Sequence, residues 1–314
     1  MKEEKIYIAT INDYLDKIGN INTFDQDNIE RRTVYFRGET DCYPHVQAGI
    51  YRIHTNSSFP EKETKIIEMT KLKFPEIIKD CSDDLDALVR LQHYSLPTRL
   101  LDVTTNPLVA LYFACFDETG KNDEKDGRVL TCTKKETPYE QIRPLASLIS
   151  GFKYRKAENI FRYLERKGFF FDEKKEQEIL LHNLVKPHLF AAPQNNPRMR
   201  FQNGAFVFSP LRYLDETDTT SINHQIMKDC NFDDLSFNQK MALHYHPLET
   251  STIDKIFDIK VFVIFHRNKA NILSKLDELG INEASIYSDY EHQMRYIKNH
   301  LFDEDRKGPQ FVIE

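Results

Sequence analysis

The chain has 314 residues, of which 40% are hydrophobic and 29% are charged. This is an ordinary globular composition, and it is sufficient to build a core. The formal net charge of −6 disfavours a general nucleic-acid binder, which usually carries a basic excess, but it leaves room for a local basic groove.

The N-terminal sequence MKEEKIYIATIND has no apolar core of the kind found in a signal peptide. No stretch approaches the roughly 18 apolar residues that a membrane-spanning helix needs. We therefore expect a cytoplasmic protein with no membrane partner. Its scattered cysteines form no C-x-x-C pair and predict free thiols rather than disulfides or a zinc site: Cys42, Cys81, Cys115, Cys132 and Cys230.

The first half of the chain alternates strand and helix patterns. Residues 4–19 predict a strand followed by a short helix, and residues 31–39 (RRTVYFRGE) predict a strand that ends near a glycine. Apolar residues at helical spacing follow in residues 60–80 and 83–95. Residues 99–104 (RLLDVT) then predict a strand. The helix after it is expected to begin at Asn106 or Pro107 and to be buried, because it is apolar on every side.

The second half contains more polar segments. Residues 153–183 predict charged helices, residues 202–209 and 259–267 predict strands, and two amphipathic helices are expected in residues 268–280 and 289–301. No repeat or linker divides the chain. We therefore expect a single α+β domain over residues 1–314. It would contain a helical insertion near residues 136–190 and a C-terminal strand-helix-helix segment near residues 255–314.

Common signatures for nucleotide, metalloprotease or hydrolase sites are absent from the sequence. The segment HYH places His244 and His246 on one face of a predicted strand. Two imidazoles do not make a zinc site, which needs three or four ligands. We therefore predict no metal site and interpret these histidines as surface or hydrogen-bonded residues.

The segment YFRGE ends an apolar run on Arg37 and Gly38. The planar guanidinium of an arginine suits phosphate or carboxylate, and a glycine allows a sharp turn or a close approach by a ligand. The alternative is a structural pair between Arg37 and an internal acid such as Asp102.

The segment LQHYSLPTRLLDVTTNPLVALYFAC, residues 91–115, gathers polar side chains where a strand meets a buried helix. Free N–H groups at such a helix terminus favour anions. The alternative is plain helix capping with packed aromatic residues, which leaves the arginine and the aspartate unexplained. The predicted ligand-binding residues of this segment are His93, Tyr94, Arg99, Asp102, Thr104, Thr105 and Asn106.

A third segment, RMRFQNGAFVF at residues 198–208, carries Gln202 just before a predicted strand. An ordinary turn into a strand would explain it equally well. Together the three segments resemble the FRG domain family, which is named after its Phe-Arg-Gly motif, here Phe36 to Gly38. The long LQHYSLPTRLLDVTTNPLVALYFA stretch, the QNGAF element and the closing ILSKLDELGINEASIYSDYEHQMRYIK segment carry the resemblance. It covers most of residues 5–298 and implies a single FRG-type domain of bacterial or phage type.

The order of these motifs also resembles the ADP-ribosyltransferase fold. Such enzymes carry an early-strand arginine, a Ser/Thr-rich strand leading into a helix, and a glutamate at the start of a late strand. Arg37, Thr104 and Gln202 occupy these positions, and Thr105 accompanies the second. The resemblance implies a mixed, mostly antiparallel sheet with flanking helices, and it implies that these three residues are catalytic.

Gln202 departs from the pattern, because a glutamine can hold a ribose hydroxyl but carries no charge. Cleavage of NAD passes through a cationic, oxocarbenium-like ribose that a carboxylate stabilises. The sequence leaves four acids open as the source of that charge: Glu39, Asp102, Glu176 and Glu178.

The resemblance therefore implies an enzyme that uses NAD as its substrate, with no separate cofactor, and passes ADP-ribose to water, a protein or a nucleic acid. Family context implies a bacterial toxin or an anti-phage effector. Arg37 would hold the pyrophosphate, Thr104 and Thr105 would shape the nicotinamide pocket, and Gln202 would contact the ribose. One alternative is a non-catalytic module that senses a nucleotide or nucleic acid and switches a partner. Another is a nuclease or hydrolase that uses Asp102 and His93.

Overall fold

The computed structural model describes residues 4–21, 33–53, 59–148, 155–193, 197–209, 211–214, 232–247, 253–287 and 290–302. Within these ranges, no helix combines the length and the apolar character needed to cross a membrane. Four of the predicted thiols, Cys42, Cys81, Cys115 and Cys132, are free, and Cys230 lies outside the described residues.

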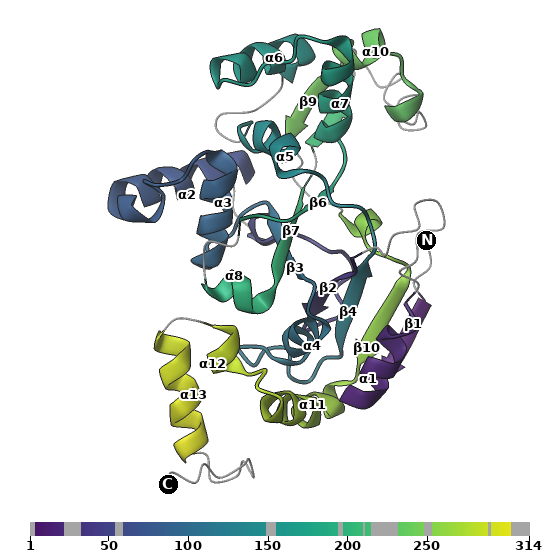
Figure 1. Cartoon of the computed structure of the whole chain (residues 1–314), viewed down its shortest axis with the longest axis vertical. Helices are drawn as coiled ribbons and strands as arrows, with labels where there is room; N and C mark the ends of the chain where they lie inside the picture. The colour runs from purple at the N-terminus through teal and green to yellow at the C-terminus, as the bar shows by residue number, and fades with distance from the viewer. Residues whose placement is uncertain are drawn as a thin grey trace.

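A seven-stranded sheet forms the centre of the molecule (Figure 1). β1 and β10 pair in parallel, and the remaining neighbours pair antiparallel, which confirms the predicted α+β class with a mixed, mostly antiparallel sheet. In spatial order the strands are β1 (Glu4–Ile8), β10 (Lys260–Ile264), β4 (Gly127–Cys132), β2 (Tyr35–Glu39), β3 (Leu100–Thr104), β7 (Gly204–Phe208) and β6 (His188–Phe190).

Helices cover one face of this sheet, and short segments cover the other. α4 (Pro107–Cys115), α11 (His266–Glu278) and α1 (Ile11–Ile18) pack against alternate side chains of the strands, Phe36, Val129 and Phe262 among them. The 3₁₀ segments η1 (Gly49–Arg52) and η4 (Asp254–Ile256) cover the opposite face, where Leu130 and Val263 are buried. Alternation along the inner strands therefore buries side chains on both faces of the sheet.

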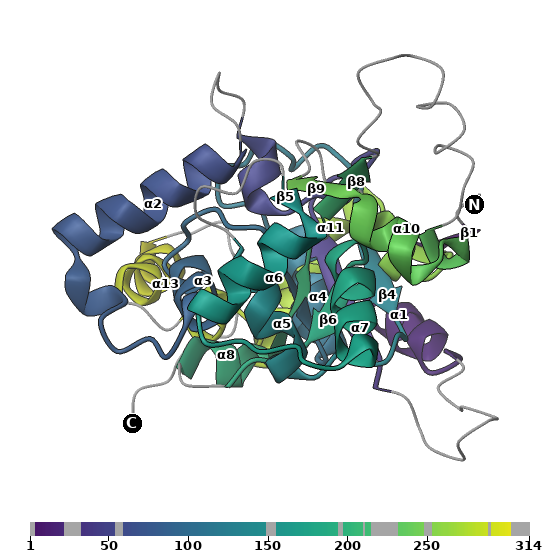
Figure 2. The same cartoon turned by 90° about the horizontal axis from the view of Figure 1, so that it is seen from above.

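A largely helical region extends beyond the β3–β7–β6 side of the sheet (Figures 1 and 2). It has its own apolar core, which includes Leu88, Ile160 and Leu181. Its helices are α2 (Phe59–Lys73), η2 (Pro75–Ile77), α3 (Asp84–His93), α5 (Tyr139–Ala146), α6 (Ala157–Arg166), α7 (Lys174–Leu184), η3 (Phe232–Asp234) and α10 (Phe237–Ala242). A small sheet of β5 (Arg155–Lys156), β9 (His244–Pro247) and β8 (Leu211–Leu214) completes it.

The C-terminal helices lie near the opposite end of the molecule. α12 (Glu283–Ile286) contacts α8 (Pro197–Gln202), and α13 (Tyr290–Phe302) extends away from the sheet (Figure 1). Arg295 on α13 forms an ion pair of 2.7 Å with Glu118, which follows α4. The chain around α4 is therefore tied to the C-terminal segment.

The predicted buried helix is α4, and it begins where the sequence indicated. The side chain of Asn106 accepts hydrogen bonds from the N–H groups of Leu108 and Val109, and Pro107 occupies the first helical position. Leu111 is fully buried. Capping and burial thus account for both the start and the placement of the helix.

Gly38 lets α4 lie directly on β2. A Cβ atom at this position would stand 1.9 Å from the carbonyl oxygen of Ala110, which is a steric overlap with main chain. Gly127 on β4 is in the same situation, because a Cβ atom there would stand 2.0 Å from the carbonyl oxygen of Ala114 on α4. The glycine of the Phe-Arg-Gly motif is therefore required for close packing between helix and strand, and its backbone does not adopt a positive φ.

The two central strands of the motif region separate from each other. Within the described residues, pairing between β2 and β3 is confined to Phe36 opposite Thr104. From that point β2 continues beside β4, and β3 continues beside β7. The divergence opens the sheet at its centre, between the strand that carries Arg37 and the strand that carries Asp102.

Candidate functional site

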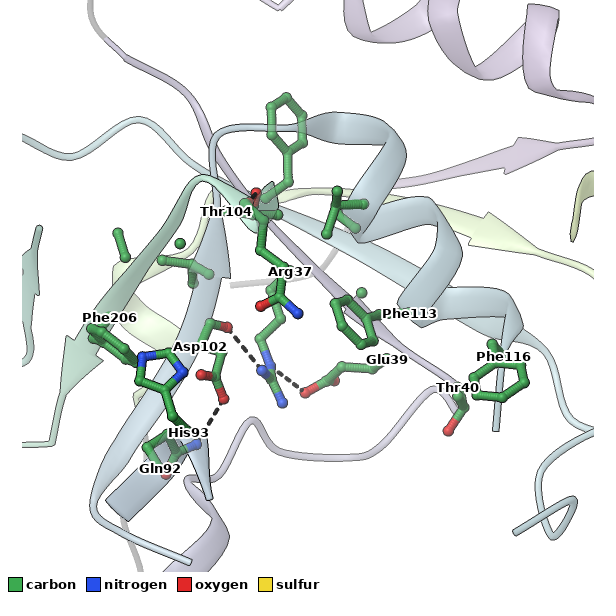
Figure 3. Close-up of a pocket in the computed structure, with 18 of the residues that line it drawn as sticks. Arg37, Glu39, Thr40, Gln92, His93, Asp102, Thr104, Phe113, Phe116 and Phe206 are labelled. Carbon is green, nitrogen blue, oxygen red and sulfur yellow. Dashed lines mark hydrogen bonds and ion pairs between the residues drawn. The ribbon is translucent and has the colours of Figure 1, made fainter. Parts of the chain in front are cut away.

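A pocket of about 250 Å³ lies at the divergence of β2 and β3 (Figure 3). Segments far apart in the chain build it. Its lining residues are Phe36, Arg37, Gly38, Glu39, Thr40, Tyr43, Arg52, Gln92, His93, Asp102, Val103, Thr104, Val109, Ala110, Phe113, Phe116, Gln202, Gly204, Ala205 and Phe206.

The pocket brings together most of the residues that the sequence motifs singled out. Arg37, His93, Asp102, Thr104 and Gln202 come from β2, α3, β3 and α8, yet all of them line the same cavity. Their convergence follows from the strand order, which places β2, β3 and β7 side by side. Gly38 also reaches the wall, although the absence of its side chain serves the contact with α4.

Two hydrogen bonds hold Arg37 in the pocket. Its Nε donates to Oε1 of Glu39 at 3.0 Å, and its Nη1 donates to the backbone carbonyl of Asp102 at 2.9 Å. The alternative of a structural pair with an internal acid is therefore confirmed in kind, with Glu39 rather than Asp102 as the acid. The second bond spans the gap between β2 and β3, where ladder hydrogen bonds are missing.

Glu39 belongs to a buried charge network, because Arg128 also donates to it. The Nε and Nη2 atoms of Arg128 lie 2.9 and 2.7 Å from Oε2 of Glu39, which is 5% exposed. Glu39 thus accepts charge-assisted bonds on both oxygens. It orients Arg37, and it keeps its bonds with Arg128 even without Arg37.

Arg52 adds a second guanidinium that sequence reasoning missed. It comes from the end of η1 and lines the same pocket as Arg37. Desolvation by the surrounding protein and the nearby charge of Arg37 lower the pKa of Arg52, although its side chain is exposed to solvent. The two guanidinium groups repel each other because both are positively charged. An anion bound between them would relieve this repulsion. Nothing in the segment IYRIH marked this arginine, because its position depends on the fold.

Asp102 is held by a hydrogen-bond relay. The Nε2 of Gln92 donates to Oδ2 of Asp102 at 2.7 Å, and the hydroxyl of Thr98 donates to Oε1 of Gln92 at 2.7 Å. Thr98 is buried, and its oxygen accepts the backbone N–H of Leu100. The Asp102 side chain itself is exposed to the pocket (Figure 3).

Thr104 and Gln202 connect the pocket to its surroundings. The Thr104 hydroxyl donates to the backbone carbonyl of Gln202 and accepts the N–H of Asn106 at 2.9 Å. The side-chain amide of Gln202 donates to the backbone carbonyl of Ile286, at the end of α12, at 3.1 Å. Both side chains therefore brace the pocket wall.

Arg99 does not line the pocket. Its Nε donates to Oε2 of Glu63 at 2.9 Å, its Nη2 contacts the same oxygen at 2.5 Å, and both side chains are almost fully buried. The guanidinium also lies over the ring of Phe208. The prediction that Arg99 binds the pocket ligand is corrected on this ground, because the side chain anchors α2 to the start of β3.

Three more predicted ligand-binding residues lie outside the pocket wall. Asn106 caps α4 with its side chain. Tyr94 ends α3 and is 57% exposed. Thr105 donates its backbone N–H to Asn203. Plain capping and turn geometry, the alternative noted for this segment, thus explain their positions.

Of the four acids left open by the sequence, two line the pocket and two do not. Glu39 and Asp102 are part of the wall. Glu176 and Glu178 lie on α7, where Glu176 forms the capping box at the start of the helix. The choice of a carboxylate for chemistry in this pocket is thereby reduced to Glu39 and Asp102.

Aromatic side chains stand at both ends of the pocket (Figure 3). Phe113 on α4 and Phe116, which follows the helix, lie on one side of Arg37. His93 and Phe206 stand on the other side, with ring centroids 6.1 Å apart in an edge-on arrangement. A ligand with two flat groups and a charged centre would match this order of surfaces.

No metal-binding group of three or more His, Cys, Asp or Glu side chains occurs within the described ranges. The side chains of His244 and His246 lie outside the described part of the chain, although β9 itself confirms the strand predicted there. The prediction concerning their role therefore stays a prediction.

A comparison with known protein families identifies the segment that carries most of the pocket residues. Residues 32–123 match the family model of the FRG domain, which confirms the resemblance in the Phe-Arg-Gly motif and in the LQHYSLPTRLLDVTTNPLVALYFA stretch. The QNGAF element and the closing segment lie outside this match. The match contains β2, α3, β3 and α4, the elements that carry Arg37, His93, Asp102 and Thr104. No curated protein and no solved structure matches the chain.

Proposed function

We propose that the pocket of this FRG-domain protein binds NAD and cleaves the bond between nicotinamide and ribose. ADP-ribose would pass to water or to a protein or nucleic-acid acceptor. The observation that carries the proposal is the pair of guanidinium groups, Arg37 and Arg52, placed in one pocket with aromatic side chains at both ends. NAD has the matching order of parts, with a diphosphate between two flat bases.

The arrangement of Arg37 supports a role in phosphate binding. Glu39 and the carbonyl of Asp102 fix two of its nitrogens, so the planar group loses little further freedom when it binds an anion. Within the described part of the chain, its Nη2 makes no hydrogen bond. A fixed guanidinium with an available edge suits a phosphate oxygen.

The test is incubation of the full chain with NAD while nicotinamide release is followed over time. We expect release by the wild-type protein and NAD affinity about 10- to 150-fold weaker in Arg37→Ala, the loss of one charge-assisted hydrogen bond. Arg37→Lys should recover only part of the affinity, because an ammonium lacks the planar fork. Arg162→Ala is the matched control, since Arg162 is an exposed arginine on α6 outside the pocket. Absence of nicotinamide release would refute the proposed cleavage, and absence of NAD binding as well would exclude NAD as the ligand of this pocket.

A second function, nucleotide sensing without catalysis, is favoured by Gln202. Its amide is committed to the backbone of Ile286, so a neutral side chain at this position links the pocket to α12 and the C-terminal helix. A sensor needs such a link between its ligand and a surface available to a partner. NAD binding that protects α12 from hydrogen exchange, without any nicotinamide release, would favour this function.

A further inference from the structure

We propose that Asp102 is the catalytic carboxylate of this pocket and that Gln92 is its positioning residue. The inference rests on the proposed NAD cleavage and specifies which group supplies the negative charge that Gln202 lacks. A developing cation at the ribose must be stabilised by a nearby anion, and the pocket wall contains the two carboxylates Glu39 and Asp102.

Glu39 is unsuited to this task because its oxygens are already occupied. Arg37 donates to one oxygen, and Arg128 donates twice to the other, at distances of 3.0, 2.9 and 2.7 Å. The side chain is 5% exposed. Two guanidinium groups neutralise the Glu39 carboxylate, so it would stabilise a substrate cation only weakly. To approach the cation, Glu39 would also have to break its hydrogen bonds with Arg37 and Arg128.

Asp102 differs in each of these respects. Its side chain is exposed to the pocket, and its Oδ2 accepts one hydrogen bond, from the neutral amide of Gln92. Within the described residues, its Oδ1 has no hydrogen-bond partner. Figure 3 shows the carboxylate beside the Arg37 guanidinium, where a ribose next to a bound phosphate would lie.

The relay behind Asp102 fixes the direction of the carboxylate. The oxygen of Thr98 accepts a backbone N–H from Leu100, so its hydroxyl proton is available to donate to Oε1 of Gln92. Because a carboxylate can only accept, the NH₂ group of Gln92 faces Asp102, and its amide oxygen faces the Thr98 hydroxyl. One oxygen of Asp102 is thereby held, and the other accepts no hydrogen bond from the part of the chain that the structure describes.

In the reaction, the bond between ribose C1′ and the nicotinamide nitrogen breaks, and its electron pair leaves with nicotinamide. The ionised carboxylate of Asp102 stabilises the cation at C1′. A water molecule then attacks C1′ and transfers a proton to Asp102, which releases it to solvent. The products are nicotinamide, ADP-ribose and one proton. A hydroxyl of an acceptor can replace the water without changing the balance.

The decisive experiment compares Asp102→Asn with the wild-type full chain in NAD cleavage and in binding of carba-NAD, an analogue that cannot be cleaved. Loss of the charge should lower kcat by about 100-fold or more, the scale of one preorganised electrostatic group. The dissociation constant of carba-NAD should stay within threefold. Glu178→Gln, an acid-to-amide change on α7 outside the pocket, should leave kcat unchanged.

Two further variants separate a catalytic role from a structural one. Formate should partly restore NAD cleavage by Asp102→Ala, because a small carboxylate can enter the space that the side chain leaves. Gln92→Leu should lower kcat more than it raises KM, since it removes the group that aims Asp102 and leaves the phosphate contacts intact. A purely structural role for either residue predicts no formate rescue and equal losses in kcat and in carba-NAD binding, and that result would overturn the inference.

The outcomes distinguish this inference from the proposed function. Wild-type protein that releases no nicotinamide would overturn both. Wild-type release matched within threefold by Asp102→Asn would overturn the assignment of Asp102 alone.

Discussion

Arg37 and Arg99 are both arginines at the ends of apolar segments, and both hold a glutamate, yet their surroundings differ. Arg99 and Glu63 are about 2% and 1% exposed, and the pair joins α2 to β3 inside the core. Arg37 is 13% exposed, and its glutamate is shared with Arg128. A buried pair with one guanidinium serves stability, whereas a guanidinium that shares its acid at a pocket wall can bind a ligand.

The largest loss of stability is expected when the buried pair of Arg99 and Glu63 is broken. Arg99→Met should reduce the free energy of unfolding by about 3–5 kcal/mol, because Glu63 would remain charged and buried without the guanidinium. Chemical denaturation measures the loss. The double variant Arg99→Met with Glu63→Leu should regain most of it, since no buried charge is left. If the single variant were as stable as the wild type, the structural role of Arg99 would be wrong.

Gly38 lines the pocket, and yet we expect it to behave as a core residue because it packs against α4. Gly38→Ala places a methyl group against the main chain of α4 and should cost about 1–3 kcal/mol or more. Gly19→Ala is a suitable control, since the nearest atom to its added Cβ is 3.4 Å away. Thermal melting of both variants checks the expectation. Equal melting temperatures would contradict the close contact between β2 and α4.

Arg37→Ala should have a smaller effect on stability, at most about 1.5 kcal/mol, the scale of a net hydrogen bond. Glu39 would still accept two bonds from Arg128 and would not become an unpaired charge. Chemical denaturation measures the stability of this variant, and titration with NAD measures its affinity, so the two effects can be separated. A loss as large as that of Arg99→Met, with unchanged NAD affinity per folded molecule, would place Arg37 with the structural arginines.

Arg52→Ala is expected to have the smallest effect on unfolding, within about 0.5 kcal/mol, because it removes a residue whose charge is opposed by Arg37. NAD affinity should nevertheless fall, and it should become less sensitive to salt than in the wild type. Titrations at two ionic strengths measure both effects. Unchanged affinity and salt dependence would exclude Arg52 from the ligand site.

Much of the fold could be predicted from local patterns. Asn106 and Pro107 marked the start of α4, and its uniformly apolar sequence indicated burial. The convergence of Arg37, Asp102 and Thr104 could be expected because each stands in or next to a predicted strand. The family resemblance was carried by motifs spread over residues 5–298, and the family model matches those that lie within residues 32–123.

Other features depended on contacts that no local pattern reveals. Arg99 looked like a site residue because its partner, Glu63, lies 36 positions away in a helix. Arg52 joins the pocket only through the course of η1, and Gln92 looked like an ordinary helix residue. Gly38 suggested a ligand contact, and the close approach of α4 could not be known before β2 and the helix were placed together.

The strand order has a practical consequence for anyone who wishes to produce the FRG segment alone. A fragment of residues 32–123 would contain β2 and β3 but neither β4 nor β7, which flank them in the sheet. Both inner strands would then present unpaired edges, which promote association with other chains. Residues 32–123 are thus sufficient to recognise the family in a sequence. A fragment that folds by itself must also include strands from both sides of this segment.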